Sequence, residues 1–120
     1  MSERGAAAVE FALVLPVVLL ALIVVIEVVG VGHTQLVVSS AAREGARVAA
    51  TTPDTAVAAA AVRTALGTRA DEARITVHRP DVVGDQAEVT VSIRYPVAAP
   101  VAGNLLEVVV RGRAVMRVEQ

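Results

Sequence analysis

Few side chains in this 120-residue chain have the types and spacing that chemistry requires. His33 and His78 are the only histidines, there is no cysteine, and neither histidine lies at a spacing that would pair a nucleophile with a base. Asp81 and Asp85 could offer two carboxylates to a cation, but the segment lacks the calcium-loop pattern and is better explained as a turn. We therefore expect no catalytic residue, no metal site, no cofactor and no small-molecule substrate.

The basic residues give no stronger indication of a ligand. From residue 33 onward ten arginines are balanced by nine acidic residues, and the net charge of the chain is -1, so a nucleic-acid partner is not expected. Arg111, Arg113 and Arg117 form a basic stripe on one predicted strand. We interpret it chiefly as a solvated face or as protection against edge pairing, with anionic headgroups or a neighbouring subunit as the alternative contact.

Glu10 and Glu27 flank the most apolar part of the chain, from Phe11 to Ile26. This run holds thirteen Leu, Ile, Val or Phe residues, each worth about 0.3 to 0.6 kcal/mol at the bilayer centre, so insertion gains roughly 4 to 8 kcal/mol. With its apolar neighbours it exceeds the roughly 20 residues that a transmembrane helix needs. The two carboxylates lie roughly 25 Å apart along a helix, so each can lie near an interface. The segment is predicted to span a membrane.

Pro16 lies inside this span and removes one helical hydrogen bond. A kink is expected rather than a break, because backbone groups in lipid have no partner outside the helix. An alternative interpretation is a secretory signal peptide that is removed after the apolar run, but Val29-Gly30-Val31 is a poor cleavage site and the run is long for a signal peptide.

Several short motifs resemble those of the TadE-like pseudopilins of the tight-adherence (Tad/Flp) type IV pilus system. They are Gly5 followed by Ala6-Ala7-Ala8-Val9 and then Glu10 and Phe11, the single proline in the helix, Ala41 to Arg47, Tyr95-Pro96-Val97, and Ala114 to Arg117. The resemblance implies a minor pilin that a separate membrane-embedded prepilin peptidase cuts between Gly5 and Ala6. Glu10 and Phe11 would then serve recognition and assembly.

The resemblance also implies partners and a location. Membrane lipid, the prepilin peptidase, other pilin or pseudopilin subunits and the pilus assembly machinery would be the partners, and the protein would reside in the cytoplasmic (inner) membrane. The N-terminus would be cytoplasmic and the C-terminal domain extracytoplasmic, with a single pass of the chain. Residues 1–5 would be the leader peptide. Cleavage would expose the amine of Ala6, which is mostly cationic at neutral pH. An incoming subunit's Glu10 could pair with that amine of a neighbour, since an unpaired buried charge costs about 3 to 5 kcal/mol.

Residues 6–52 are predicted to form one helix that continues beyond the membrane. Apolar residues recur at helical spacing in its second half, at positions Leu36, Val37, Ala41, Gly45 and Val48. Small residues four apart in the same region would serve close packing against other helices, or would simply be covered by the chain's own domain. Both interpretations are open from the sequence.

Residues 53–120 are predicted to form a small α+β extracytoplasmic domain. Thr52 is the expected N-cap of a short helix with Pro53 at its first position, and Gly67 is the expected stop. The predicted apolar stripe of this helix is Val57, Ala61, Val62, Ala65 and Leu66.

Period-two alternation then predicts strands near residues 73–78, 87–94 and 106–118, with residues 95–104 as a loop. The inner face of the last strand is predicted to consist of Leu106, Val108, Val110, Ala114, Met116 and Val118. The expected fold is α+β: a long N-terminal helix, transmembrane in its first half, plus a short helix packed on a three-stranded antiparallel sheet.

Two other classes of function fit the sequence less well. One is an unprocessed single-pass membrane protein with a small extracytoplasmic binding domain. The other is a secreted hydrolase with a signal peptide, which the lack of a catalytic constellation disfavours.

Overall fold

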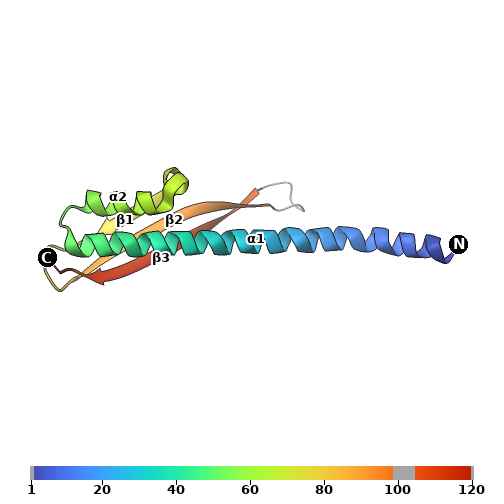
Figure 1. The fold of residues 1–120 in the computed structure, drawn as a ribbon, viewed down its shortest axis with the longest axis horizontal. Helices are drawn as coiled ribbons and strands as arrows, with labels where there is room; N and C mark the ends of the chain where they lie inside the picture. Colours follow the sequence, from blue (N-terminus) through green and yellow to red (C-terminus); the bar gives the residue numbers. More distant parts are fainter. Residues whose placement is uncertain (1, 99–104, 120) are drawn as a thin grey trace. The chain divides into compact units, whose positions relative to one another are not determined.

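The computed structural model describes residues 2–98 and 105–119 and has the predicted α+β architecture (Figure 1). The elements follow in the order α1 (Glu3–Thr51), α2 (Thr55–Leu66), a 3-10 helix η1 (Gly67–Glu72), β1 (Ala73–His78), β2 (Gln86–Ala98) and β3 (Leu105–Arg117). The chain divides into two compact units, Met1–Gly30 (unit 1) and Val31–Gln120 (unit 2). Each unit is described by itself below.

Unit 1 consists of the first part of α1. The helix is capped at its start by Ser2, whose carbonyl oxygen accepts from the N–H groups of Gly5 and Ala6 at 2.9 and 3.1 Å. These bonds satisfy two of the amides that have no partner within a helix's first turn. The helix then continues through Pro16 without interruption, as expected for a proline whose neighbours have no alternative to helix in lipid.

In unit 2 the remainder of α1 lies against the sheet and α2. The buried residues of this part are small or β-branched: Thr34, Val38, Ala41, Ala42, Gly45, Ala46, Ala49 and Ala50. The small residues are therefore covered by the chain's own domain, which settles the two interpretations left open by the sequence. The predicted apolar face was wrong at Leu36, whose side chain is 71% exposed while Val38 is buried instead.

The short helix α2 begins two residues later than predicted. Asp54, rather than Thr52, is the N-cap, and its carboxylate accepts from the amide of Ala56 at 2.9 Å. Thr52 instead donates its N–H to Val48 O and so closes α1. Gly67 ends α2 as predicted, with a positive φ of 61° that favours glycine.

The buried face of α2 also differs from the predicted stripe. The helix buries Ala58, Val62 and Leu66, whereas Val57 is 45% exposed. These three buried residues recur every four positions, so they form a single narrow row on the helix surface.

The sheet is antiparallel with the strand order β1-β2-β3. The β1–β2 connection is the predicted hairpin, in which Gly84 adopts φ 96° and donates its N–H to Val118 O at 2.9 Å. Val118 in turn donates to Asp85 O at 2.7 Å, so this turn is bonded to the residue that follows β3.

The prediction of a loop from Tyr95 to Asn104 was wrong for its first four residues. Tyr95 to Ala98 continue β2 and pair with Val108 to Leu105 of β3. The strand β1 begins opposite Ile93, so among the described strands this part of β2 is paired on one side only, with β3. A proline is tolerated on such an edge, which explains how Pro96 fits into the strand. The rest of the predicted loop, residues 99–104, lies outside the described residues.

The inner face of the sheet forms the core together with α1 and α2. Ala87, Val89, Val91 and Ile93 of β2 are all buried, as the alternation predicted. On the inner face of β3, Val110 and Gly112 are buried and Ala114 is partly buried. Val118, just beyond the strand, is buried as well. The predicted inward positions Leu106, Val108 and Met116 are exposed, so the prediction of a fully buried β3 face was wrong.

Two glycines allow the helix to approach its neighbours closely. An added Cβ at Gly112 would lie 2.5 Å from the carbonyl oxygen of Val38, and one at Gly45 would collide with the side chain of Val62. Both glycines therefore serve close packing rather than an unusual backbone conformation.

The C-terminal end of α1 is held by two groups from later in the chain. Arg79 Nε donates to Ala49 O at 2.6 Å, and the N–H of Glu119 donates to Ala50 O at 2.9 Å. Carbonyl groups at a helix end have no partner within the helix, and a cation there also suits the helix dipole. The end of α1 is therefore closed by the side chain of Arg79, which follows β1, and by the backbone of Glu119 in the C-terminal segment.

Candidate processing and assembly site

The predicted cleavage site lies in the first turn of α1. Gly5 is half-buried and Ala6 is exposed, and the N–H of Gly5 also donates to the hydroxyl oxygen of Ser2 at 3.3 Å. The bond between Gly5 and Ala6 is thus part of a helix, and a peptidase would have to unwind this turn to reach it. A glycine weakens a helix by roughly 1 kcal/mol relative to alanine, so Gly5 makes this turn easier to open than an alanine in its place would.

Glu10 lies one turn after Ala6 on the same helix face. Its side chain is exposed, and within residues 2–98 and 105–119 no ion pair involves its carboxylate. Phe11 is 66% exposed and is rotated by about 100° from Glu10, so it lies on a different part of the helix surface. The structure thus brings Ala6 and Glu10 together and sets Phe11 apart. The roles assigned to these four residues stay predictions.

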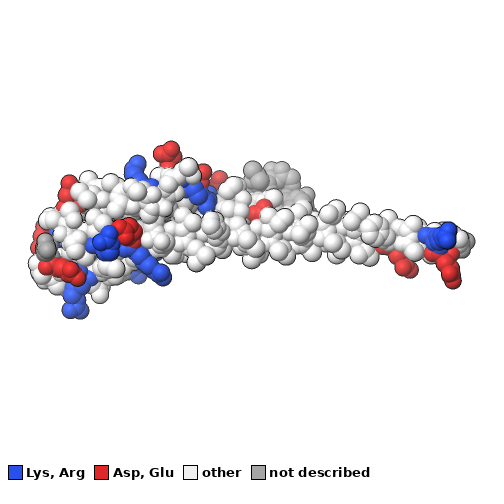
Figure 2. All heavy atoms as spheres, viewed as in Figure 1, with Lys and Arg blue, Asp and Glu red and all other residues white. Residues whose placement is uncertain are grey.

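The apolar part of α1 is unusual in its exposure. One 18-residue window of the helix has a mean hydropathy of 3.1, and none of that window is buried within the protein. Side chains as large as Leu13 are 70% exposed there. Figure 2 shows that charged side chains gather over unit 2, whereas most of the visible surface of unit 1 carries none. An apolar surface of this extent requires lipid or another protein to cover it.

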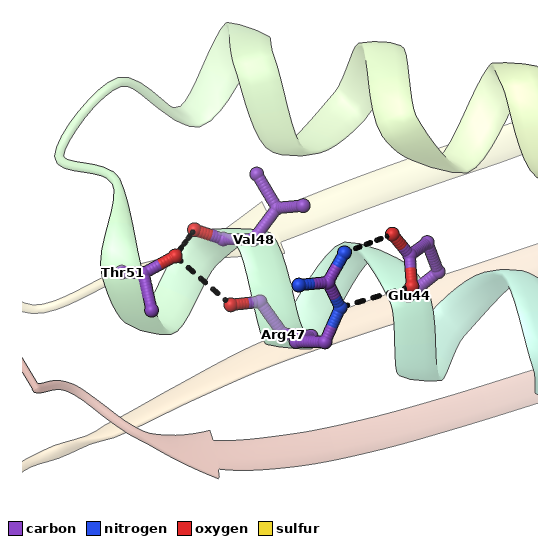
Figure 3. A network of polar contacts seen from close by, with 4 residues as sticks. All are labelled: Glu44, Arg47, Val48 and Thr51. Carbon is purple, nitrogen blue, oxygen red and sulfur yellow. Dashed lines mark hydrogen bonds and ion pairs between the residues drawn. The ribbon is translucent and has the colours of Figure 1, made fainter.

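The motif Ala41 to Arg47 has two separate structural roles. Its small residues Ala41, Ala42, Gly45 and Ala46 are buried in the core of unit 2. Its charged residues face outward, where Arg47 makes two hydrogen bonds to the carboxylate of Glu44, at 2.6 and 3.1 Å (Figure 3). The hydroxyl of Thr51 bonds the carbonyl oxygens of Arg47 and Val48 one turn later.

In two ion pairs of unit 2, an arginine shifts the pKa of the glutamate that it pairs with. The hydrogen bond from Arg47 lowers the pKa of Glu44 from its ordinary value, and the charge of Arg47 acts in the same direction. The hydrogen bond from Arg113, at 2.7 Å, likewise lowers the pKa of Glu88. Both pairs are solvent-exposed, so they contribute little to stability. Arg113 of the predicted basic stripe is therefore paired with Glu88 on the neighbouring strand β2.

The other candidates for chemistry do not converge. His33 and His78 are both exposed and belong to different elements, α1 and β1. Asp81 and Asp85 lie in the β1–β2 connection, where the backbone of Asp85 makes turn hydrogen bonds. Across the described parts of the chain, no group of three or more His, Cys, Asp or Glu side chains is arranged to hold a metal ion.

Several structurally important residues were missed from the sequence. Arg79 binds the end of α1, and Arg69 Nη1 donates to the buried hydroxyl of Thr34 at 2.8 Å. Nothing in the local pattern around either arginine signals these long-range bonds. Gly112 gave a weak signal, because a glycine inside an alternating strand often marks a close backbone approach.

The exposed apolar helix and the compact unit 2 together define a class: membrane-anchored proteins with a small α+β domain. Residues 5–47 match the sequence model of the TadE-like protein family. The resemblance found in the motifs is thus confirmed over this part of the chain, which includes the predicted cleavage site, the apolar helix and the motif that ends at Arg47. Comparisons with curated proteins and with solved structures gave no match.

Proposed function

We propose that this chain is a non-enzymatic pseudopilin or minor pilin of a Tad-type pilus system. It would be made as a precursor, anchored by the apolar part of α1 with its N-terminus in the cytoplasm, and cut by a prepilin peptidase between Gly5 and Ala6. Unit 2 would then lie outside the cytoplasmic membrane. The observation that carries the proposal is the TadE-like match over residues 5–47, which covers both the cleavage site and the apolar helix.

The geometry of α1 supports a role for Glu10 in subunit pairing. Removal of residues 1–5 would leave a cationic amine on Ala6, one turn from an exposed carboxylate. In a bilayer the carboxylate can reach the headgroups, but in a bundle of helices it would be buried. A buried charge without a partner costs about 3 to 5 kcal/mol, so the amine of a neighbouring subunit is the natural partner and would fix the axial register between subunits.

The intact mass of protein extracted from membranes tests processing. Loss of Met1 to Gly5 supports the proposal, and a full-length mass would instead support an unprocessed membrane protein with a binding domain. Loss of about thirty residues would indicate a signal peptide and a secreted domain.

The pairing role is tested by Glu10→Gln, with Glu3→Gln as the matched control. Glu3 is also an exposed carboxylate of the first turns of α1, but it belongs to the leader and would be absent from the mature subunit. We expect Glu10→Gln to insert and be cut normally but to enter pilus assembly at less than one tenth of the wild-type rate, because the loss of about 3 kcal/mol exceeds a tenfold effect. Assembly of Glu10→Gln at the rate of Glu3→Gln would refute the pairing role.

A further inference from the structure

The sheet of unit 2 extends at one end into a two-stranded ribbon with apolar side chains on both faces. Beyond the first residue of β1, residues Arg94–Ala98 of β2 pair, among the described strands, only with Leu105–Val109 of β3. Leu106 and Val109 are 58% and 55% exposed, and Val108 is also exposed. Neighbours in a strand point to opposite faces, so Val108 and Val109 place an apolar side chain on each face of the ribbon, and the Val109 face also carries the charged pair Arg94 and Glu107.

This ribbon lies at the end of unit 2 where α1 enters it. Gln35 donates its side-chain N–H to Arg111 O at 2.8 Å, whereas the amide of Glu119 bonds Ala50 O at the far end. Therefore α1 and β3 run in the same direction, and the ribbon residues, which precede Arg111, lie on the side of Val31. Val31 is the first residue after unit 1, which contains the apolar segment, so in a membrane-anchored chain this is the end of unit 2 that is joined to the anchor.

A basic groove adjoins the ribbon on the outer face of the sheet. Arg74, Ser92 and Arg111 form a row across the three strands, because Ser92 is paired with both arginines. They line a groove of about 390 Å³, whose other lining residues are Glu72, Ala73, Arg94 and Val109.

The charge balance of the groove is positive. It contains three arginines and a single carboxylate, that of Glu72, which lies 3.7 Å from Arg69 outside the groove lining. Arg94 shares a 3.7 Å contact with Glu107 of the ribbon. Val109 lines the groove as well, so the apolar ribbon and the basic row form one continuous surface.

We propose that this surface docks unit 2 onto the anionic bilayer in which the chain is anchored. The ribbon side chains Leu106, Val108 and Val109 enter the boundary between headgroups and acyl chains, and Arg74 and Arg111 bind lipid phosphates. Apolar groups on both faces suit insertion into an interface, where lipid surrounds them, better than contact with a flat protein surface. Arginines next to the inserted residues add attraction to anionic lipid. This proposal needs the membrane anchor but neither cleavage after Gly5 nor subunit pairing.

The depth of the ribbon can be measured in the full-length protein, because the chain has no cysteine and a single one can be labelled. Leu106→Cys and, as a second position, Val109→Cys would carry an environment-sensitive fluorophore. Val83→Cys is the matched control, since Val83 is 63% exposed and lies in the turn at the opposite end of the sheet. The proteins would be reconstituted at low density into phosphatidylcholine vesicles with or without about 30% phosphatidylglycerol and with spin-labelled lipids as quenchers.

We expect both ribbon labels to be quenched at least threefold more than the label at Val83, and more strongly when phosphatidylglycerol is present. Arg74→Gln with Arg111→Gln should remove the dependence on phosphatidylglycerol. Equal quenching of all three labels would overturn the proposal. So would a fluorescence change that follows protein density instead of lipid charge, because a second copy of the chain would then cover the ribbon.

Discussion

The close contact between Gly112 and α1 provides a sensitive test of how unit 2 is packed. In Gly112→Ala the new Cβ would lie 2.5 Å from Val38 O and 2.7 Å from Ser39 N. Non-bonded atoms prefer separations of about 3.5 to 4.0 Å, so the helix would have to move by about 1 Å. The atoms in the way belong to the helix backbone and cannot rotate aside, as the end of a side chain could.

The expected loss can be set against the stability of the unit. Overpacking a core costs about 1 to 3 kcal/mol, and the rigid neighbours place this site toward the upper end. Alanine recovers less than 1 kcal/mol by restricting the unfolded chain, so the net loss is about 2 kcal/mol. Unit 2 comprises residues 31–120, and a domain of this size has a stability of roughly 5 to 13 kcal/mol. The substitution should therefore remove a considerable fraction of it.

Hydrogen exchange of the β2 amides in the detergent-solubilised protein measures this loss. A destabilisation of about 2 kcal/mol should accelerate their exchange about 30-fold where exchange follows opening of the domain. Gly32→Ala is the control, because nothing lies within 4 Å of a Cβ added there and a helix gains by up to about 1 kcal/mol from the change. Exchange within threefold of wild type in Gly112→Ala would refute the close packing, and equal acceleration in Gly32→Ala would show that the effect is not specific to the contact.

Two further predictions concern polar contacts of unit 2. Arg79→Met should destabilise the domain by about 1 to 3 kcal/mol, because Ala49 O at the end of α1 would lose a charged donor. Hydrogen exchange of the last-turn amides of α1 measures this loss and should become faster. Unchanged exchange of these amides would contradict the prediction. The lowered pKa values of Glu44 and Glu88 mean that the stabilisation from their ion pairs is complete above the ordinary glutamate value of about 4.3 and is lost as the pH falls through the folded-state pKa values. The wild type should therefore keep its small advantage in unfolding midpoint over Glu44→Gln/Glu88→Gln at neutral pH and lose it progressively as the pH falls below about 4.3; an advantage that does not shrink with further acidification would be the contrary result.

The sequence predicted the elements of this fold better than their burial. Alternation located β1 and the buried face of β2, and the absence of breakers before Pro53 predicted a long α1. The N-cap of α2 was assigned to Thr52 because that residue precedes a proline, yet Asp54 has the capping geometry. Adjacent capping residues compete, and the choice depends on how the chain leaves α1, which a local pattern does not contain.

The other errors share a cause, since they depend on which elements are neighbours. Pro96 is compatible with a strand only because β1 begins at the level of Ile93 and does not reach Pro96. Leu36 is exposed because the sheet lies on the side of Val38. For the candidate site, the spacing of Ala6 and Glu10 was readable directly, because both lie on one regular helix. The bond from Arg69 joins residues 35 positions apart and the bond from Arg79 joins residues 30 positions apart, and no periodicity indicates such pairs.

The common direction of α1 and β3 has a mechanical consequence. A force that draws the chain through its N-terminal segment would load the helix–sheet interface of unit 2 along its length, in shear. The contacts from Gln35 to Ala50 would then share the load, whereas a helix attached at its far end alone would be peeled away bond by bond. A domain with this geometry would resist extraction of α1 with the whole helix–sheet interface at once.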